Sequence, residues 1–484
     1  MAFAVIFLTW DIASRPIVLW DESRLAVNAL EMSQHGFSLI TTYGFQPDLW
    51  NTKPPLLIWL MAGSIRLFGP EEWAIRAPSL LAGLATLALV MRFSWRLSRS
   101  AGVAATATLT LLLSFGFFGN HAAASGDYDA LLTLFTTGYI LLLFETLHRR
   151  RPDASRVIAC GLLIAGACLT KGIAGLAPGA GIATYVLARH RWPRLFQTPW
   201  YAAAGLIAAV LVGGYYALRE AASHGYLAAV IYNEIDARYV RGFRGHIHSP
   251  LFYLGVLSRA FAFGPAFALP FLAMATPWKR TKSAAFLVYA NHVSLLLILV
   301  YSLGRTKIFW YLMPIYPVLS IAFAISARHV LGLLRRNGPD LLTRPIVGRV
   351  SLLDGLVGLA AAAAALGALV YDVKLPVGMN LPQGRYGQVF AQLQRQGILH
   401  IRTLDSGVPN DELHGYTPQL RFYSLAWRGR GLDVAPGDPN TFAAEARNAV
   451  LVTCDPRYLD KVRALGPPRT SIADCAAAAG PSGR

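Results

Sequence analysis

Long apolar runs recur along the first three quarters of the chain, and many approach the roughly 20 residues that an α-helix needs to cross a bilayer. Short polar segments rich in arginine and lysine separate these runs. The pattern predicts a polytopic α-helical membrane protein of about 11 spans with additional interfacial helices. The expected spans cover residues 1–13, 75–96, 101–119, 128–147, 156–170, 172–188, 200–218, 251–277, 284–302, 308–327 and 352–372.

The apolar run from Pro54 to Phe68 is too short to be assigned as a span from its length. If this run does not cross, every arginine-dense short loop falls on one side of the membrane, which the positive-inside rule makes cytoplasmic. We therefore expect a helix that lies at, or dips into, the outer interface. The same assignment of spans places four regions on the outer face: residues 14–74, 120–127, 219–250 and everything after about residue 372. The short junctions at Lys171 and at Arg305–Lys307 lie on that face too.

The hydrophobic pattern changes after about residue 372, where short amphipathic helices and apolar strands alternate. This alternation predicts a small α/β domain. The expected helices are 388–396, 440–448 and 457–465, and the expected strands are 398–404 and 449–454. The predicted domains are a transmembrane domain, 1–372, and a soluble periplasmic α/β domain, 373–484, whose Ala/Gly/Ser-rich end from Ala476 to Arg484 is disordered.

Composition supports a membrane protein, because 55% of the residues are hydrophobic and only 14% are charged, against about a quarter charged in soluble domains. The formal net charge of +18 could indicate nucleic-acid binding. The basic residues lie in short loops rather than on one soluble face, which argues against nucleic acid as a partner. Cys160 and Cys168 are expected to be buried. Cys454 and Cys475 could pair if the tail lies outside the cytoplasm, and the sequence leaves this open.

The stretch from Leu19 to Pro55 carries the first candidate site, since charged residues lie there between apolar segments. Asp21 is the leading general base, because a partly desolvated carboxylate can be tuned to accept a proton. Glu22 points elsewhere on a helix and is the expected support residue. Arg24 lies one turn after Asp21 and could pair with it or bind an anion. The alternative is a solvated loop in which Asp21 caps a helix.

Two lysines and two aspartates are further candidates. Lys53 precedes two prolines that fix the chain direction, although snorkelling to the interface would also explain it. Lys171 lies between two apolar runs and needs an anionic partner, either a carboxylate or a phosphate. Asp127 and Asp129 begin the next span, where they could cap the helix, hold a metal or orient Arg and Lys side chains.

Two other segments on the predicted outer face carry weaker signals. The loop 232–253 includes Glu234, Arg238, His246 and His248; its His-x-His spacing is a weak metal signal, and a solvated basic loop is the commoner outcome. Around the mouth of a span, cations and an aromatic residue indicate either an interfacial belt or binding of a phosphate headgroup. These last residues are Arg305, Lys307 and Tyr311.

Many cations and few carboxylates on one face suit a substrate with a phosphate at the interface and an apolar body in the bilayer. A lipid-phosphate sugar carrier has this chemistry. The cations would stabilise the charge that develops on the departing phosphate, and an aspartate would activate or orient the acceptor.

Several motifs resemble the GT-C membrane glycosyltransferases, particularly the family 39-like branch of protein O-mannosyltransferases and aminoarabinose transferases. The similarity covers roughly residues 15–330 in consistent order. The motifs are Asp21-Glu22-x-Arg24, Lys53-Pro54-Pro55, Asp129-Ala-Leu-Leu-Thr-Leu-Phe, Leu169-Thr-Lys171-Gly and Tyr311-Leu-Met-Pro314-Ile-Tyr-Pro317.

The resemblance implies a polyprenyl-phosphate sugar donor, an outward-facing site and transfer with inversion at the anomeric carbon. By motif, Asp21 matches the catalytic aspartate of the first outer loop, and Arg24 and Lys53 match ligands of the carrier phosphate. Tyr311 falls in a segment near the carrier, and Lys171 matches the Lys-Gly motif.

One departure concerns metal binding. Aminoarabinose transferases have a glutamate just before the lysine that is associated with a bound metal, and here that position is Thr52. His248 resembles the loop histidine that would share the metal. A divalent cation therefore remains compatible with the sequence, but the metal ligands are unknown and the residues do not establish a requirement for any cofactor.

The sequence thus predicts an inverting, polyprenyl-phosphate-sugar-dependent glycosyltransferase of the bacterial inner membrane, acting on lipid A, another glycolipid or a protein. A flippase or transporter for a lipid-linked sugar is the alternative, although the internal repeats and midplane charges of transporters are not evident. A scaffold whose folded tail is the working part is a third reading.

Overall fold

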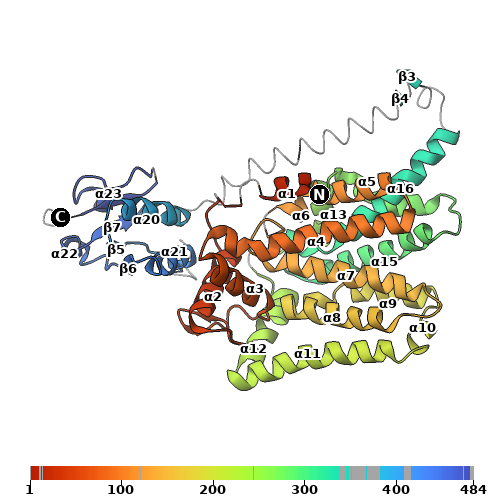
Figure 1. The fold of residues 1–484 in the computed structure, drawn as a ribbon, viewed down its shortest axis with the longest axis horizontal. Coiled ribbons are helices and arrows are strands. Elements are labelled where there is room, and N and C mark those ends of the chain that lie inside the picture. The colour runs from red at the N-terminus through yellow and green to blue at the C-terminus, as the bar shows by residue number, and fades with distance from the viewer. Residues whose placement is uncertain are drawn as a thin grey trace. The chain divides into compact units, whose positions relative to one another are not determined.

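The computed structural model describes residues 2–9, 12–13, 15–119, 121–243, 245–337, 345–347, 350–351, 367, 382–407, 416–472 and 474–479 (Figure 1). The chain divides into two compact units, which we describe separately. The first contains Met1–Trp10, Pro47–Leu57 and Arg76–Val373. The second contains Asp11–Gln46, Ile58–Ile75 and Lys374–Arg484.

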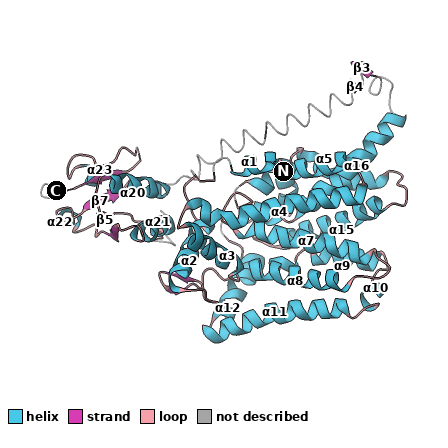
Figure 2. Ribbon diagram, viewed as in Figure 1, coloured by secondary structure: helices cyan, strands magenta, loops and turns pink. Residues whose placement is uncertain are grey.

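Helices make up almost all of the regular structure before residue 338 (Figure 2). Among the described residues, six helices are long and apolar enough to cross a membrane, or seven if one bent pair forms a single span. The chain is therefore a multi-pass membrane protein. The six spans are α4 (Glu72–Ser98), α7 (Tyr128–Leu147), α8 (Ala154–Lys171) with the 3-10 turn η1 (Gly172–Leu176), α11 (Trp200–Ala222), α15 (Lys282–Leu303) and α16 (Ile315–Asn337).

Shorter elements connect or flank these spans. They are α1 (Ala2–Thr9), α2 (Asp21–His35), β1 (Thr42–Tyr43), β2 (Gln46–Pro47), α3 (Leu56–Phe68), α5 (Ala101–Leu112), α6 (Phe115–Phe118), α9 (Gly179–Ala188), α10 (Pro193–Phe196), α12 (Tyr226–Val230), the π-helix η2 (Ile231–Arg241), α13 (Phe252–Ala260), η3 (Gly264–Ala268), α14 (Leu269–Leu272), η4 (Ala273–Ala275) and η5 (Phe309–Leu312). The strands β3 (Pro345–Val347) and β4 (Val350–Ser351) pair antiparallel.

The helices differ from the predicted spans where glycine and proline interrupt them. The predicted span 251–277 bends by 113° between α13 and the helices that begin at Gly264, where Pro265 cannot continue a helix. In the predicted span 172–188, α9 is only 10 residues long and begins after Pro178. α1 and α5, of 8 and 12 residues, likewise cover only part of the predicted spans 1–13 and 101–119. The expected span 352–372 lies outside the described residues except for residue 367, so the predicted number of spans is not confirmed.

A glycine sets the distance between two spans of the first unit. A Cβ added at Gly161 of α8 would lie 2.4 Å from the backbone oxygen of Ala204 in α11. Because only glycine fits at this separation, the two backbones touch directly, as small residues allow in membrane helix pairs. This contact fixes α8 at its middle, ten residues before it ends at Lys171.

The C-terminal region forms the predicted small α/β domain within the second unit. Its four-stranded sheet has the order β6-β5-β7-β8, with β5 (His400–Thr403) parallel to both β6 (Asp433–Pro436) and β7 (Val450–Thr453). Strand β8 (Ala476–Ala478) pairs antiparallel with β7. The helical elements are η6 (Pro382–Arg385), α20 (Tyr386–Arg395), α21 (Pro418–Arg428), α22 (Phe442–Glu445) and α23 (Leu459–Arg463).

The predicted disorder from Ala476 is wrong for the residues of β8, and residues 480–484 lie outside the described part. The short alanine strand gave no periodic signal, because it is buried on both faces. The sequence also failed to predict α21 and β6. The predicted boundary between residues 372 and 373 falls outside the described residues and stays a prediction.

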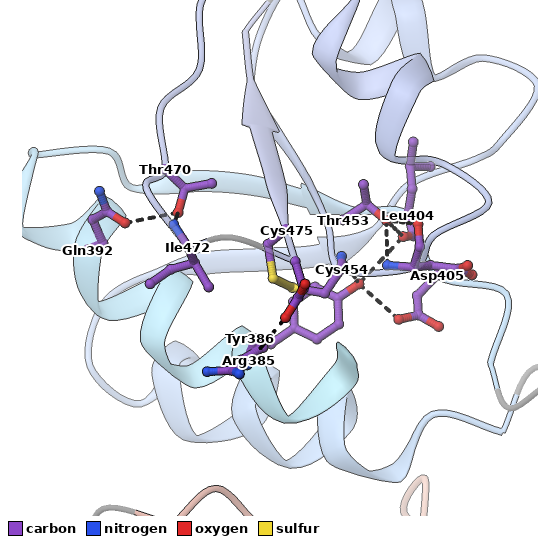
Figure 3. Close-up of a disulfide and its surroundings, with 12 residues drawn as sticks. Arg385, Tyr386, Gln392, Leu404, Asp405, Thr453, Cys454, Thr470, Ile472 and Cys475 are labelled. Atoms are coloured by element: carbon purple, nitrogen blue, oxygen red, sulfur yellow. Dashed lines mark hydrogen bonds and ion pairs between the residues drawn. A yellow bond between two sulfur atoms is a disulfide. The ribbon is translucent and has the colours of Figure 1, made fainter. Parts of the chain in front are cut away.

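A disulfide closes the edge of this sheet (Figure 3). It joins Cys454, directly after β7, to Cys475, directly before β8. The backbone N–H of Cys454 donates to the hydroxyl of Tyr386 on α20 at 3.1 Å, and that hydroxyl donates to Asp405 Oδ2 at 2.8 Å. One buried tyrosine thus connects the ends of both central parallel strands.

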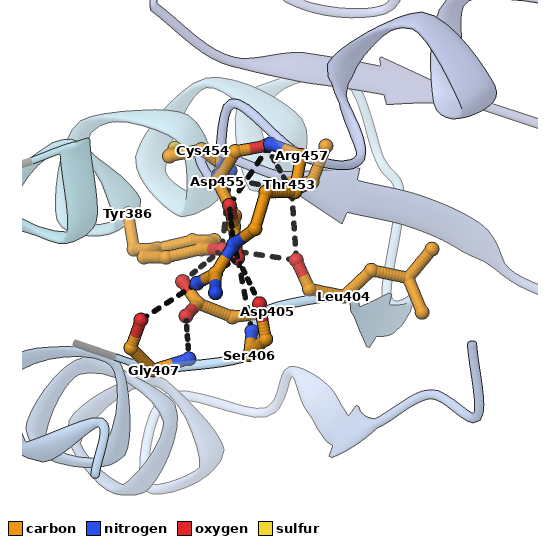
Figure 4. Close-up of polar contacts among 9 residues, drawn as sticks. All are labelled: Tyr386, Leu404, Asp405, Ser406, Gly407, Thr453, Cys454, Asp455 and Arg457. Atoms are coloured by element: carbon orange, nitrogen blue, oxygen red, sulfur yellow. Dashed lines mark hydrogen bonds and ion pairs between the residues drawn. The ribbon is translucent and has the colours of Figure 1, made fainter. Parts of the chain in front are cut away.

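The loops that follow β5 and β7 are held together by Asp455 (Figure 4). Its Oδ2 accepts hydrogen bonds from the backbone N–H and the hydroxyl of Ser406 at 3.0 and 2.6 Å, and its Oδ1 accepts one from Arg457 Nε at 2.9 Å. Burial alone would raise the pKa of Asp455, but the hydrogen bonds from Arg457 and Ser406 lower this pKa to about 2.

We expect Asp455→Asn to destabilise the α/β domain by about 2 kcal/mol at neutral pH, since each unit of pKa shift corresponds to about 1.4 kcal/mol. Because the pKa is lower in the folded state, this stabilisation is present above the unfolded pKa and is lost as the pH falls toward the folded pKa of about 2. Native-state hydrogen exchange in β5 and β7 of the full-length protein measures the effect. Asp460→Asn, at an almost fully exposed side chain, is the control. Equal exchange in both variants would contradict the prediction.

Candidate functional site

A buried ion pair joins two spans of the first unit. Lys171 Nζ lies 2.5 Å from Asp129 Oδ2, and the two side chains are 8% and 1% exposed. Gly172 has a φ of 58°, which ends α8 and leaves Lys171 as its last residue, while Asp129 lies in the first turn of α7. A cation at a helix C-terminus and an anion at a helix N-terminus are each favoured by the helix dipole. The predicted need of Lys171 for an anionic partner is therefore met by a carboxylate.

This ion pair lies at a cavity of about 260 Å³. The charged part of the wall consists of Asp129, Lys171, Glu234 and Arg238. The remaining lining is mainly apolar and aromatic: Leu132, Ile173, Ala174, Leu176, Ala177, Ala180, Tyr239, Val300, Tyr301 and Tyr311, with Gly304 and Thr306. A ligand in this cavity would therefore contact both apolar and charged side chains.

The π-helix η2 supplies two of the charged groups. Arg238 Nε lies 3.0 Å from Glu234 Oε2, one helical turn away. Lys53 Nζ lies 3.7 Å from Glu234 Oε1, and the Thr52 hydroxyl donates to the same oxygen at 3.1 Å. Burial alone would raise the pKa of Glu234, but the charges of Lys53 and Arg238 lower this pKa to about 2. Glu234 is therefore ionised at neutral pH and neutralises part of the cationic charge.

Lys53 lines a second cavity, of about 270 Å³, together with Thr52, Pro54 and Tyr216. Lys171 and Glu234 line both cavities, so they form part of the wall between them. Lys53 Nζ is also 5.6 Å from the centre of the Tyr128 ring. The structure thus brings the predicted residues Lys53, Asp129 and Lys171 into one region of the first unit.

Arg305, Lys307 and Tyr311 are predicted from the sequence to lie around the mouth of a span. Of these three described residues, Tyr311 alone lines the first cavity. Arg238 Nη1 donates to the Tyr311 hydroxyl, and Lys171 Nζ lies 5.5 Å from the centre of its ring. Lys307 donates to Gly304 O at 2.6 Å, and Arg305 donates to Val240 O at 3.0 Å. These two bonds to backbone carbonyls hold the loop, and a role of either residue in substrate binding stays a prediction.

The predicted acidic pair begins α2 in the second unit. Asp21 is the first residue of the helix, where the dipole favours a negative charge. Glu22 is buried, and its Oε2 accepts a hydrogen bond from the backbone N–H of Val18 at 2.7 Å, which fits a supporting role. The Arg24 guanidinium lies over the Tyr43 ring at 4.2 Å. Asp21 and Lys53 belong to different units. The expectation that the two side chains lie close together therefore stays a prediction.

The positions that the family resemblance would assign to a metal hold different groups here. Thr52 offers a hydroxyl, and the adjacent carboxylate comes from Glu234, whose two oxygens already contact Lys53 and Arg238. His248 stacks on Phe252 with 4.3 Å between ring centres. A carboxylate neutralised by two cations is a poor ligand for a divalent ion, so these residues do not fit a metal, and we derive no step through one.

Sequence reasoning assigned Glu234 and Arg238 to a solvated basic loop and missed their place in the cavity wall. A usable signal was present, because Glu234 is followed by Arg238 at the i,i+4 spacing of a helical ion pair. Apolar periodicity could not reveal this helix. Several of its apolar side chains are exposed, namely Ile231, Tyr232, Ile235, Tyr239 and Val240.

Sequence comparisons find similarity to proteins that are named as sugar transferases. Residues 52–216 match the family model described as dolichyl-phosphate-mannose-protein mannosyltransferase. An uncharacterized protein from Aquifex aeolicus is 27% identical over 66% of this chain and 61% of its own length. An undecaprenyl phosphate-alpha-4-amino-4-deoxy-L-arabinose arabinosyl transferase from Edwardsiella ictaluri is 27% identical over 74% of this chain and 63% of its own length. The chain thus spans about three-fifths of these relatives.

Structure comparison gives the fold. The crystal structure of ArnT from Cupriavidus metallidurans bound to undecaprenyl phosphate matches with a TM-score of 0.69 and 19% identity, over 98% of this chain and 96% of that one. These comparisons confirm the predicted resemblance to GT-C glycosyltransferases and the helical membrane fold with a small C-terminal α/β domain.

Proposed function

We propose that the protein is an inverting glycosyltransferase that transfers a sugar from a polyprenyl-phosphate donor, of the undecaprenyl-phosphate type, to an acceptor in the cell envelope. Lipid A, another glycolipid and a protein are the acceptor classes considered. One relative is named as an undecaprenyl phosphate-aminoarabinose arabinosyl transferase, and a structure of the same fold was solved with undecaprenyl phosphate.

The observation that carries this proposal is the mixed lining of the first cavity. Its apolar lining residues suit an isoprenoid chain, and its charged lining residues suit a phosphate. Across the two cavities the three cations Lys53, Lys171 and Arg238 exceed the two carboxylates Asp129 and Glu234 by one charge. A sugar phosphodiester carries a single negative charge, so the donor would leave the region neutral.

In the proposed reaction, the acceptor hydroxyl attacks the anomeric carbon while Asp21 accepts its proton. A new bond forms between the acceptor oxygen and that carbon as the bond from the carbon to the phosphate oxygen breaks. The phosphate leaves with the electron pair and gains a second negative charge, which Lys53 and Lys171 stabilise. Attack opposite the leaving group inverts the configuration of the sugar.

We also propose that the reaction takes place on the periplasmic side of the bacterial inner membrane. The arginine-dense short loops support this orientation through the positive-inside rule. The Cys454–Cys475 disulfide supports it independently, because such bonds persist in oxidising compartments. An alkaline phosphatase fused after Arg484 should be active in cells, and an inactive fusion that is fully produced would contradict the orientation.

Incubation of the purified protein with a panel of polyprenyl-phosphate sugars and envelope acceptors tests the proposed transfer. We expect mass spectrometry to detect an acceptor that has gained one sugar, together with free polyprenyl phosphate. In liposomes, the rival flippase would instead move the lipid across the bilayer while its sugar–phosphate bond stays intact. Movement without cleavage for every donor would overturn the proposal.

A further inference from the structure

Helix α21 of the C-terminal domain contacts α2 at several points within the second unit. These contacts involve Tyr416, which lies two residues before α21, and the first two turns of the helix, which together we call the 416–423 segment. Helix α2 begins with Asp21, the proposed general base. The contacts therefore join a domain distant in sequence to the helix that carries the reacting acid.

The far end of α2 is held through Glu31, which is fully buried. Its carboxylate accepts hydrogen bonds from the Thr42 hydroxyl at 2.7 Å and from the backbone N–H groups of Gly44 and Phe45 at 2.8 and 2.9 Å. Arg421 Nε and Nη2 both lie 3.3 Å from Glu31 Oε1. A buried carboxylate needs a compensating charge, and Arg421 provides it from α21.

The beginning of α2 is held by a series of aromatic and cationic side chains. The Tyr43 ring lies 4.2 Å from the Arg24 guanidinium and 5.2 Å from the Arg421 guanidinium. The Tyr416 ring lies 5.5 Å from the Arg24 guanidinium and stacks on Trp20 with 5.9 Å between ring centres. Residues on both sides of Asp21 in the sequence, Trp20 and Arg24, thus contact the 416–423 segment.

The chain that leads into α2 is held in the same way. Tyr423 accepts a hydrogen bond from the backbone N–H of Ile17 at 3.0 Å and donates to Glu72 Oε1 at 3.1 Å. Gln419 Nε2 donates to Ile17 O. The helix entry, its first turn and its far end are therefore all fixed by one short segment of the C-terminal domain.

We infer that the 416–423 segment positions the catalytic helix, with Arg421 as the principal positioning residue, so that the C-terminal domain sets the placement of Asp21. This inference rests on the proposed function. Arg421 is not a catalytic residue, because it acts on Asp21 only through Glu31 and Tyr43. A displacement of about 1 Å at a reacting group can reduce a rate about a hundredfold, so a loosened α2 would reduce turnover.

The test compares Arg421→Ala, Arg421→Lys and the control Arg428→Ala in the purified full-length protein. Arg428 lies on the same helix, but its Nε donates to Val434 O within the α/β domain at 2.5 Å. For Arg421→Ala we expect kcat to fall about tenfold to a hundredfold. The KM for the donor should change by a smaller factor than kcat, since Lys53 and Lys171 lie on other elements and only Arg24 among the predicted phosphate ligands lies on α2. Arg421→Lys, which keeps the charge beside Glu31, should recover part of kcat.

Hydrogen exchange provides a readout that does not depend on transfer. Arg421→Ala should speed exchange in α2 and leave β5 and β7 unchanged, whereas Arg428→Ala should leave α2 unchanged. The inference is overturned if Arg421→Ala keeps the wild-type kcat and exchange, or if Arg428→Ala produces the same loss. If Arg421→Ala does not accumulate in cells, kcat and hydrogen exchange of Arg421→Lys are compared with those of the wild type instead. Wild-type values of both would then overturn the inference. If the wild-type protein transfers no sugar, the proposed function is wrong. Hydrogen exchange in α2 would still show whether the 416–423 segment holds this helix in place.

Discussion

Lys171→Ala should destabilise the protein by about 3–5 kcal/mol, because it leaves the buried carboxylate of Asp129 without its cation. Asp129 is fully buried, and its Oδ1 has no hydrogen-bond partner among the described residues, so Lys171 provides the main compensation. Reversible unfolding in mixed detergent micelles measures the change in free energy. The same variant should lose sugar transfer, since it also removes a proposed phosphate ligand.

The double variant Lys171→Leu with Asp129→Leu separates these two effects. Replacing both members of a buried pair by apolar residues is often neutral or stabilising. We therefore expect this protein to recover its stability and to remain inactive in transfer. A single Lys171→Ala variant as stable as wild type would contradict the buried pair, and an active double variant would contradict the role in transfer.

Asp21→Asn should reduce the rate of sugar transfer by about 10²–10⁴-fold, the usual contribution of a general base. Asparagine has nearly the same size and is also favoured at a helix N-terminus, so α2 should still form. The measurement is the initial rate of acceptor labelling at saturating donor, with thermal unfolding as the check on folding.

Glu22→Gln is the matched control, because a glutamine Oε1 can still accept the hydrogen bond from Val18. Its rate should stay within about tenfold of wild type. If Asp21→Asn transfers sugar at the wild-type rate, Asp21 is not the general base. That result would say nothing about the proposed binding residues of the first unit.

The apolar pattern predicted the uninterrupted spans well, because long helices in a bilayer must be apolar over their whole length. Helix α7 covers the predicted 128–147, since Asp127 caps its start and the polar segment after Leu147 ends it. The pattern failed where backbone chemistry overrides hydrophobicity. The apolar residues 251–277 could not reveal that Gly264 and Pro265 bend the chain by 113°.

The candidate site was predictable in its residue types and only partly in its pairings. Charge next to apolar sequence singled out Lys171 and indicated a need for an anion, but two anions were compatible and no local spacing identifies Asp129, 42 positions away. Glu234 has the i,i+4 spacing of a helical ion pair with Arg238, but its arginine-rich surroundings in the sequence gave no sign that it lines a cavity. Its environment arises from tertiary contacts with Lys53 and Thr52, which the sequence does not encode locally.

The direct backbone contact between Gly161 and Ala204 has a consequence for how this protein can vary. The α-helical rise makes the interval from Gly161 to Lys171 about 15 Å long, and each residue adds about 100° of rotation about the axis. Loss or gain of one residue within this interval would turn the ammonium group away from the carboxylate that neutralises it. The number of residues from 162 to 170 is therefore constrained in its own right, separately from the side chains that they carry.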